Sequence, residues 1–401
     1  MKTALELISD LARWQSDSAM AAVIASAATG SWDKAEIHAL AKALANSGAT
    51  LDFPSDLPTA DLASTGAPSS LSTLLCPLFL RELGFVVPKL GVAGRPAGGI
   101  DVLAQLDGYR TTLSIEEARR VLDRCGYAHF LAGPTFAPLD AALFLYRQNA
   151  GAQNIPALAA ASILAKKIAC GLSLAGLDVR VAPHGNFGGD FCAARHTADL
   201  FCGAARIAGI AAVAALSDAR VPYQPYIGRG ESLLALRLIF EERADTWLKE
   251  HLDHCHLMAA HVAALHPPAA ISKGTLAKLF FENVEAQGGS ERSFYERTDT
   301  LAQAIQHEVR ADRDGFLSID LLGLRTAIVS ANKRNNAQFP DELGVRLRQR
   351  PGAYVAAGEL LATVRSEKKQ TWEHYQQSLK ACFKAVDLLN HSSGIEEFVR
   401  A

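Results

Sequence analysis

The sequence predicts an α/β core that follows a helical N-terminal segment and precedes a small β-rich C-terminal domain. Residues 1 to about 50 repeat apolar side chains at three- and four-residue spacing, which is typical of amphipathic helices. Between about residues 60 and 200, strand-like runs alternate with helical segments, and glycine-rich loops lie at the junctions. From about residue 308, short β-branched runs are punctuated by glycine and proline.

The N-terminal part contains two clear helical patterns, LELISDLARW and DKAEIHALAKALANSGA. Gly48 follows the second pattern, where a glycine would cap the helix. We therefore expect the first fifty residues to form helices that bury one face.

The α/β part begins with the loop STGAPSSLST, followed by the apolar run LLCPLFLREL and the predicted strand LGFVVPKLGV. A second glycine-rich loop, AGRPAGG, leads to a predicted helix that opens with a capping box at Ser114. HFLAG is a short predicted strand. Pro156 to Leu174 is a strong helical segment, and it precedes the predicted strand LDVRVAP and a third glycine loop, HGNFGGDF.

The C-terminal part is predicted to contain short strands in EVRADRDGFLSID, LRTAIVS and GVRLRQRPGAYVAAGELLATVRS. A succession of short predicted strands is typical of a separate small β-rich domain.

Composition limits the class of protein. A chain of 401 residues is too long for one ordinary hydrophobic core, so two or three folded units are expected. The formal charge of −2 disfavours a nucleic-acid-binding surface. No apolar run is long enough to span a bilayer. The seven cysteines are scattered and form no CxxC pair, which favours reduced thiols. We therefore expect a soluble cytoplasmic protein without a nucleic-acid or membrane partner.

The most informative residues for chemistry are Arg147, Ser162 and Lys166. Ser162 and Lys166 are four residues apart on a predicted helix, so both project from one face. An arginine, a serine and a lysine at one spot suit a planar ligand with two carbonyl oxygens and an N–H between them, such as uracil or thymine. Fixed cations there would stabilise negative charge on a departing pyrimidine. From spacing alone, solvated surface charges remain the alternative.

The segment YRQNAGAQNIPALAAASILAKKIACGLSLAGLDVRV resembles the signature of the thymidine phosphorylase and pyrimidine-nucleoside phosphorylase family, of the glycosyltransferase family 3 type, which includes the AMP phosphorylases. ASTG, AGRPAGGIDVLAQLDGY, PYIGRGESLLAL, FENVEAQGGSE and GAYVAAGELLATV resemble further family segments in the same order. The resemblance implies that Arg147, Ser162 and Lys166 are the catalytic residues that hold and polarise the base, with Tyr146 beside them.

The resemblance also implies an α/β fold with a separate all-helical lobe, a central mixed sheet flanked by helices, and a C-terminal β-rich α+β domain. The helical lobe would contain residues 1–58 together with about 139–172. The α/β lobe would contain residues 59–138 and 173–300, and the C-terminal domain residues 301–401. Family members are usually homodimers that associate through their helical lobes.

The sequence departs from the family in its phosphate-binding loops. A Lys-His pair precedes Ser-Thr-Gly in the family, and these two positions are Leu62 and Ala63 here. Two apolar side chains replace a cation and an imidazole. The serine of the second loop corresponds to Ala93, and its threonine falls at or near Gly99.

Several residues remain that could bind phosphate, the expected co-substrate: Ser64, Thr65, Ser72, Thr73 and Arg95. His184, in the third glycine loop, is the candidate to replace the lost imidazole. STGAPSS is equally a good turn sequence without any ligand. No cofactor is expected.

A histidine-rich helix, WLKEHLDHCHLMAAH, places His251, His254 and Cys255 on one face. The spacing matches no standard zinc module, and a half-exposed helix explains it equally well, so no metal site is expected.

The sequence thus predicts phosphorolysis of a pyrimidine nucleoside to the free base and a (deoxy)ribose 1-phosphate. Two alternatives stay open: an altered glycosyltransferase or nucleosidase with another acceptor or a nucleotide substrate, and a nucleoside- or base-binding protein without turnover. The choice of base and sugar is open as well.

Overall fold

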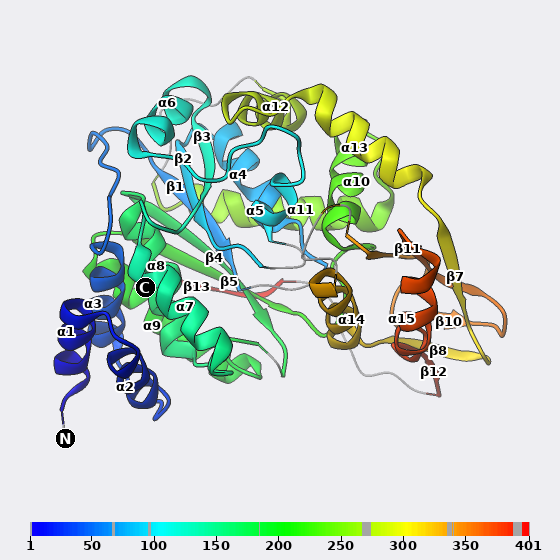
Figure 1. Cartoon of the computed structure of the whole chain (residues 1–401), viewed down its shortest axis with the longest axis horizontal. Coiled ribbons are helices and arrows are strands. Elements are labelled where there is room, and N and C mark those ends of the chain that lie inside the picture. Colours follow the sequence, from blue (N-terminus) through cyan, green and yellow to red (C-terminus); the bar gives the residue numbers. More distant parts are fainter. Residues whose placement is uncertain are drawn as a thin grey trace.

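The computed structural model describes residues 2–65, 69–94, 98–183, 185–266, 274–334, 339, 341–387 and 395–400. Its central sheet has the strand order β1-β4-β5-β13, with β1, β4 and β5 parallel and β13 antiparallel (Figure 1). The strands are β1 (Ala60–Ser64), β4 (Leu174–Val181), β5 (Ala211–Asp218) and β13 (Ile395–Arg400). This mixed sheet carries helices on both faces, which confirms the predicted fold class.

The N-terminal helices pack against helices from the middle of the chain. α3 lies along α8 and α9, and α9 covers one face of β4 and β5, so one continuous apolar core joins these helices to the sheet (Figure 1). Capping boxes at Thr3 and Asp33 start two of the helices. The helices are α1 (Ala4–Trp14), α2 (Asp17–Ala27), α3 (Lys34–Ala45), α7 (Pro138–Asn149), α8 (Pro156–Ala169) and α9 (Phe191–Ile207).

Gly48 does not cap α3, which ends at Ala45 with Asn46 as its C-cap. A Cβ atom on Gly48 would lie 2.5 Å from Pro138 Cδ and 2.6 Å from the Thr135 carbonyl oxygen. The glycine is therefore required by the close approach of the segment that leads into α7.

A second core lies on the opposite face of the central sheet, where α4 and α11 pack on β1, β4 and β5. The strands β2 (Val87–Gly91) and β3 (Tyr127–Leu131) form a parallel pair beside β1. The helix after Ser114 opens with the predicted capping box. The helices of this region are α4 (Ser72–Glu82), α5 (Gly99–Leu103), α6 (Ile115–Cys125), α10 (Arg229–Phe240), α11 (Thr246–Ala263), α12 (Leu276–Ala286) and α13 (Glu291–Gln303).

β1 and β2 begin side by side and then diverge. Thr59 forms a parallel bridge with Val86, and Ala60 N–H donates to the Val86 carbonyl. Beyond this point the described part of β2 pairs with β3 instead, at Val87 through Gly91. The divergence opens a gap at the carboxyl ends of β1 and β2, which is where open parallel sheets bind ligands.

The C-terminal part forms a third core. Its sheets have the orders β6-β9-β11-β7 and β10-β8-β12, and the last strand, β13, leaves this unit and pairs with β5. The elements are β6 (Tyr226–Ile227), β7 (Gln306–Arg310), β8 (Gly315–Ile319), α14 (Leu321–Arg334), β9 (Leu343–Leu347), β10 (Tyr354–Val355), β11 (Leu360–Ser366), α15 (Lys369–Ala381) and β12 (Phe383–Val386).

The strand predicted in LRTAIVS is wrong, because this segment lies inside α14. Leu321, Leu324 and Ile328 are buried at three- and four-residue spacing, so the helical periodicity overrides the β-branched composition. In the part of the chain that the structure describes, no helix is long and apolar enough to span a lipid bilayer.

Candidate active site

A cavity of about 360 Å³ lies at the diverging carboxyl ends of β1 and β2. The helices α7 and α8 form one side of it, the loop after β1 and the start of α4 form the other, and α14 contributes two residues. The cavity thus lies between α7 and α8, the carboxyl ends of β1 and β2, and α14 of the C-terminal part.

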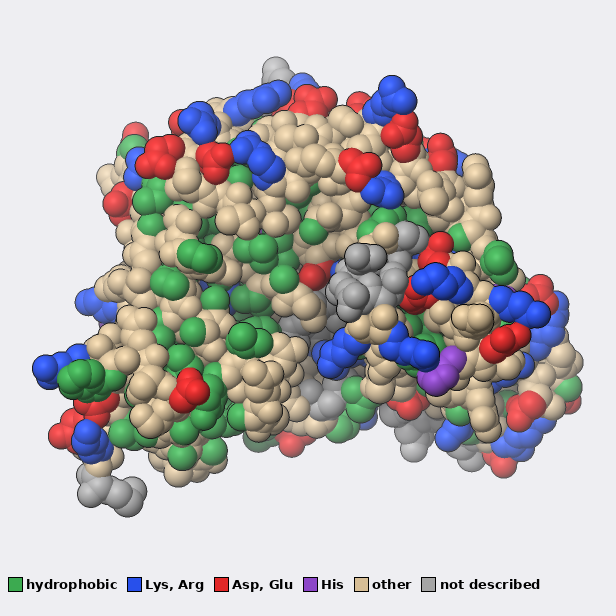
Figure 2. Space-filling model, in the orientation of Figure 1, with side chains coloured by type: hydrophobic (Ala, Val, Ile, Leu, Met, Phe, Trp, Pro, Cys, Tyr) green, Lys and Arg blue, Asp and Glu red, His purple; other side chains and the backbone are tan. Residues whose placement is uncertain are grey.

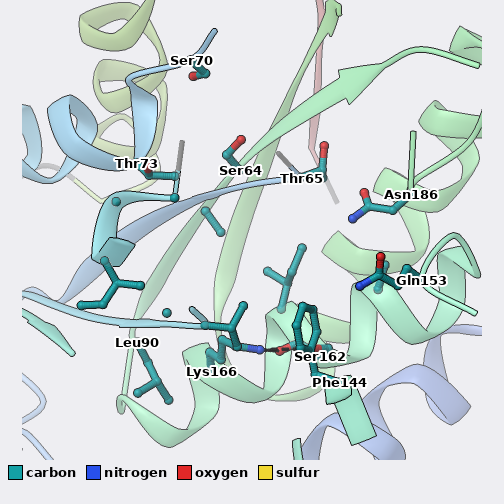
Figure 3. Close-up of a pocket in the computed structure, with 18 of the residues that line it drawn as sticks. Ser64, Thr65, Ser70, Thr73, Leu90, Phe144, Gln153, Ser162, Lys166 and Asn186 are labelled. Carbon is teal, nitrogen blue, oxygen red and sulfur yellow. Dashed lines mark hydrogen bonds between the residues drawn. The ribbon is translucent and has the colours of Figure 1, made fainter. Parts of the chain in front are cut away.

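The structure brings Arg147, Ser162 and Lys166 together on this cavity. Figure 3 shows Ser162 and Lys166 side by side at one end, next to Phe144, an aromatic lining residue from α7. Phe144 precedes Arg147 by three residues, so both occupy one face of α7. This spacing is the signal by which the sequence could have identified Phe144. We call this end of the cavity, with Phe144, Arg147, Ser162 and Lys166, the base end.

Lys166 is held by a buried network. Its Nζ donates to Asp140 Oδ2, to the Ser162 carbonyl at 2.8 Å and to Ser162 Oγ at 3.0 Å. Burial lowers the pKa of Lys166, and the neighbouring Asp140 carboxylate opposes that shift. Because Ser162 Oγ accepts from a cation, its own hydroxyl proton is left to donate to a ligand.

Arg147 is buried and fixes the loop between α7 and α8. Its guanidinium donates to the carbonyls of Ala152 at 3.2 Å, Gln153 at 2.9 Å and Leu158 at 3.3 Å. Tyr146, the adjacent residue, packs against the first core and is absent from the cavity lining. The structure therefore separates Tyr146 from the other three predicted base-binding residues.

The other end of the cavity is lined by Ser64, Thr65, Ser70 and Thr73 (Figure 3). We call it the hydroxyl end. Thr73 Oγ1 is buried and has no hydrogen-bond partner among the described residues. Ser72 does not line the cavity, because its hydroxyl donates to Asp178 Oδ2 at 2.6 Å.

Arg180 orders the hydroxyl end from behind. Its side chain pairs with Asp178 and donates to the hydroxyls of Ser70 and Ser72, and its backbone N–H donates to Thr65 Oγ1 at 2.8 Å. Burial lowers the pKa of Arg180, but the Asp178 carboxylate more than compensates and raises it. Arg180 is thus a fixed cation that positions the loop residues, a role that the sequence did not reveal.

Two predicted site residues, Arg95 and His184, lie outside the described residues. On the helix α11, His251 Nε2 accepts a hydrogen bond from Leu71 N–H at 2.9 Å. That nitrogen helps to fix the start of α4. Among the described residues, no group of three His, Cys, Asp or Glu side chains is arranged to hold a metal ion.

A buried charge network, which the sequence did not predict, lies below the cavity. Asp61 accepts from Lys89 Nζ through Oδ1 at 2.8 Å and from Lys167 Nζ through Oδ2. Burial raises the pKa of Asp61, but the two ammonium groups outweigh it and lower the pKa to about 2. A lysine within the buried strand VVPKLGV was the available signal, since lysine is almost never fully buried unless paired.

The cavity is strongly basic. Its described lining contains five lysine or arginine side chains and no aspartate or glutamate. The five are Lys89, Arg147, Lys166, Lys167 and Arg325. Asp61 and Asp140 neutralise part of this charge from behind the lining. The remaining positive charge, partly enclosed by protein, suits an anionic ligand.

Arg325 comes from α14 in the C-terminal part, and Figure 2 shows Lys and Arg side chains gathered over this helix. Its side chain has no hydrogen bond or ion pair with any described residue. Burial alone lowers its pKa. The sequence missed Arg325 because its segment was predicted to be a strand of a separate domain.

Comparison with known proteins confirms the resemblance found in the sequence. The chain is 29% identical over 361 residues to a thymidine phosphorylase from Mycobacterium tuberculosis, covering 87% of this chain and 82% of the relative. It is 26% identical over 388 residues to a thymidine phosphorylase from Sinorhizobium fredii, covering 91% of this chain and 88% of the relative. No family model matches the chain.

Among solved structures, the fold is similar to that of anthranilate phosphoribosyltransferase from Thermus thermophilus. The TM-score is 0.52 at 16% sequence identity, and the match covers 74% of this chain and 93% of that chain. At this identity the likeness concerns the fold alone.

Proposed function

We propose that the protein catalyses phosphorolysis of a pyrimidine nucleoside of the thymidine or uridine type, giving the free base and a (deoxy)ribose 1-phosphate. One observation carries the proposal. A single cavity holds an Arg-Ser-Lys set at its base end and, at its hydroxyl end, hydroxyl groups that Arg180 positions from behind. The similarity to thymidine phosphorylases over nearly the whole chain supports the same reaction.

At the base end, the reaction needs stabilisation of a departing pyrimidine. When the bond between C1′ and N1 breaks, its electron pair moves onto the ring and is shared by the two carbonyl oxygens. The Ser162 hydroxyl would donate to one of these oxygens, and the charges of Lys166 and Arg147 would stabilise the developing anion. Phe144 offers an aromatic face for the ring.

At the hydroxyl end, a phosphate oxygen would form the new bond to C1′. Ser64, Thr65 and Thr73 can donate hydroxyl protons to the other phosphate oxygens. The buried Oγ1 of Thr73, which lacks a partner among the described residues, supports a polar ligand there. Inorganic phosphate is then the co-substrate, and the proposed reaction needs no cofactor.

A nucleotide is a second candidate substrate, and Arg325 favours it. Its guanidinium lines the cavity and bonds to none of the described residues, and a forked guanidinium suits a phosphate monoester. Comparison of nucleosides with their 5′-monophosphates in the wild type and in Arg325→Leu decides between the two. A nucleotide enzyme should prefer the monophosphate and lose that preference in the variant.

We further propose a cytoplasmic homodimer that associates through the helical lobe. Leu5 and Trp14 on α1 and Leu145 on α7 are large apolar side chains exposed by 52%, 62% and 57%. Figure 2 shows apolar side chains gathered over this lobe. Light scattering on the purified protein, compared with Trp14→Glu, tests the dimer.

The experiment for the proposed function measures release of uracil or thymine from uridine, thymidine, UMP and CMP, with and without millimolar phosphate. Each assay is paired with Lys166→Met. Base release that needs both phosphate and Lys166 supports phosphorolysis. Release without phosphate indicates a nucleosidase, and binding of the free base without any release indicates a non-catalytic binding protein.

A further inference from the structure

The positions that carry the Lys-His pair in the related family provide no charge in this protein. Leu62 points away from the cavity into the second core, where its side chain and that of Val262 pack around Gly176. Ala63 lines the cavity with a methyl group. If the hydroxyl end binds phosphate, its cation and its imidazole must come from elsewhere in the fold.

A lysine and a histidine meet at the same cavity on the neighbouring strands. Lys89 on β2 and His129 on β3 are direct partners in the parallel register, and both line the cavity. Both side chains are buried, with exposed fractions of 4% and 2% for the two residues. The pair lies beside the hydroxyl end, since the His129 ring and Thr73 Oγ1 both approach Gly99 and Lys89 Nζ contacts the Leu62 carbonyl of β1.

Lys89 bridges the gap between the diverging strands. Its Nζ donates to the Leu62 carbonyl at 2.6 Å and to Asp61 Oδ1 at 2.8 Å. The Leu62 carbonyl therefore accepts from a side chain on β2 where a continuous ladder would offer a backbone N–H. An ammonium group has three donors, and the third has no partner among the described residues.

The charges around Lys89 leave an excess of one positive unit. Lys89 and Lys167 share the single carboxylate of Asp61, and all three are buried. A buried charge is stable when it is paired, so the cluster of Lys89, Lys167 and Asp61 lacks one negative charge. An anionic ligand at the hydroxyl end would supply that partner.

His129 has its ring oriented by a tyrosine. Tyr127 Oη lies 3.1 Å from His129 Nδ1, and both side chains are buried. Burial raises the pKa of Tyr127, so the phenol keeps its proton and can donate it to Nδ1. The proton of a neutral imidazole then resides on Nε2, which has no hydrogen bond to any described residue.

The Cε1–Nε2 edge of the His129 ring faces Gly91 and Gly99, next to Thr73. A Cβ atom on Gly99 would lie 2.6 Å from His129 Cε1 and 3.2 Å from Thr73 Oγ1, and a Cβ on Gly91 would lie 3.4 Å from Nε2. His129 and the partnerless Thr73 hydroxyl thus approach the same backbone segment. Glycine at position 99 keeps this space open, since any side chain there would collide with the ring.

We propose that Lys89 and His129 form the phosphate-binding subsite of this protein, in place of the Lys-His pair that the related loop carries. The subsite rests on the proposed function for the identity of its anion, and it includes Thr73. Lys89 donates one N–H⁺ and His129 donates Nε2–H to phosphate oxygens. Asp61 and Tyr127 are positioning residues that orient these two donors.

The test uses two kinds of variant in the full-length protein. Lys89→Met removes the charge at nearly constant length, and Asp61 keeps Lys167 as its partner. His129→Asn keeps an atom near Nδ1 for Tyr127 but loses the donor at Nε2, whereas His129→Gln keeps a donor near Nε2. Lys166→Met is the matched control, because it removes a cation from the base end of the same cavity.

Binding of inorganic phosphate is measured by calorimetry, and the KM for phosphate and for the nucleoside are measured separately. Lys89→Met and His129→Asn should each weaken phosphate binding by about 10- to 100-fold, because each removes a hydrogen bond to a charged group. Nucleoside KM should change by less than about 3-fold, and His129→Gln should stay within that range of the wild type for phosphate. Lys166→Met should instead raise the KM for the nucleoside and leave phosphate binding within about 3-fold of the wild type.

Unchanged phosphate binding in folded Lys89→Met and His129→Asn would overturn the inference, and so would a wild type that binds no phosphate. If Lys89→Met fails to fold, the comparison of His129→Asn with His129→Gln decides alone. Phosphate binding that depends on Lys89 and His129, in a protein that releases no base, supports the subsite while contradicting the proposed phosphorolysis.

Discussion

Lys89 and His129 lie opposite each other on β2 and β3, and both reach the cavity that contains Arg147, Ser162 and Lys166. The two residues are neighbours because β2 pairs with β3 in parallel register, while β1 separates from β2 after the bridge between Thr59 and Val86. The positive charge that the related family carries at the positions of Leu62 and Ala63 is supplied here by Lys89 on the adjacent strand β2. The cavity keeps a basic character although Leu62 and Ala63 are apolar.

The buried ion network should be essential for stability. Asp61→Asn leaves the ammonium groups of Lys89 and Lys167 without a carboxylate, which should cost about 3–5 kcal/mol in the free energy of unfolding. Urea denaturation measures this loss. Asp107→Asn is the control, because it breaks an exposed ion pair with Arg297 and should cost less than about 1 kcal/mol. Equal costs for the two variants would contradict the assignment.

The same network predicts the acid limit of stability. The pKa of Asp61 is lowered in the folded state from 3.8 to about 2. A carboxyl group with a lowered folded pKa contributes stability above its unfolded pKa and loses it as the pH falls through the folded value. The contribution of Asp61 should therefore be complete above about pH 4 and disappear towards pH 2. The difference in the free energy of unfolding between wild type and Asp61→Asn should therefore become smaller as the pH falls over that interval.

Ser162 and Lys166 should act as one unit. Lys166 Nζ donates to Ser162 Oγ, so each variant disturbs the partner of the other. Lys166→Met should lower kcat/KM for the nucleoside by about 100-fold or more, and Ser162→Ala by about 10-fold. The double variant should lose less than the product of the two. Fully multiplicative losses in a double-mutant cycle would show that the two side chains act independently.

Gln287 should hold His129 in position. Its side chain accepts from His129 N–H at 2.8 Å and donates to the carbonyls of His129 at 2.9 Å and Arg110 at 2.7 Å. Gln287→Leu leaves these buried groups without partners and should cost about 1–3 kcal/mol, measured by thermal unfolding. It should also weaken phosphate binding. Glu285→Gln, on the exposed side of the same segment, should leave both quantities unchanged.

The pH dependence of anion affinity should follow the titration of Lys89 and show no step from a titration of His129. Burial and the nearby Lys89 charge hold the pKa of His129 well below its usual value, so its ring is neutral from about pH 6 to 8. Burial also lowers the pKa of Lys89 from 10.5, despite Asp61. Sulfate is the probe because it does not titrate in this range. Its affinity should be constant from about pH 6 to 8 and should then decrease as the pH rises, with a midpoint below 10.5, because Lys89 loses its proton. Affinity that rises as the pH falls through 7 would indicate a titrating imidazole.

The sequence predicted the fold class and the placement of Ser162 and Lys166 on one helix face, because both depend on local spacing. Ser162 and Lys166 needed only the helical repeat to share a face, and the helices and strands around β4 followed the apolar periodicity. α14 was mistaken for a strand because its β-branched residues concealed a helical repeat.

The hydroxyl end was harder to predict because its residues meet only through tertiary contacts. Lys89 and His129 are forty residues apart and become neighbours through strand pairing. Ser72 has hydroxyl chemistry suited to phosphate, yet its hydroxyl contacts Asp178 behind the loop, which local sequence could not indicate. Arg325 lines the cavity from α14, which is distant in sequence from the other lining segments.

The most direct test of the central claim is identification of the sugar product by phosphorus NMR after incubation of wild-type protein with thymidine or uridine and inorganic phosphate. Phosphorolysis should give one (deoxy)ribose 1-phosphate for each base released, and no product without phosphate. Free sugar released together with the base, or no base release from any pyrimidine nucleoside or nucleotide, would contradict it.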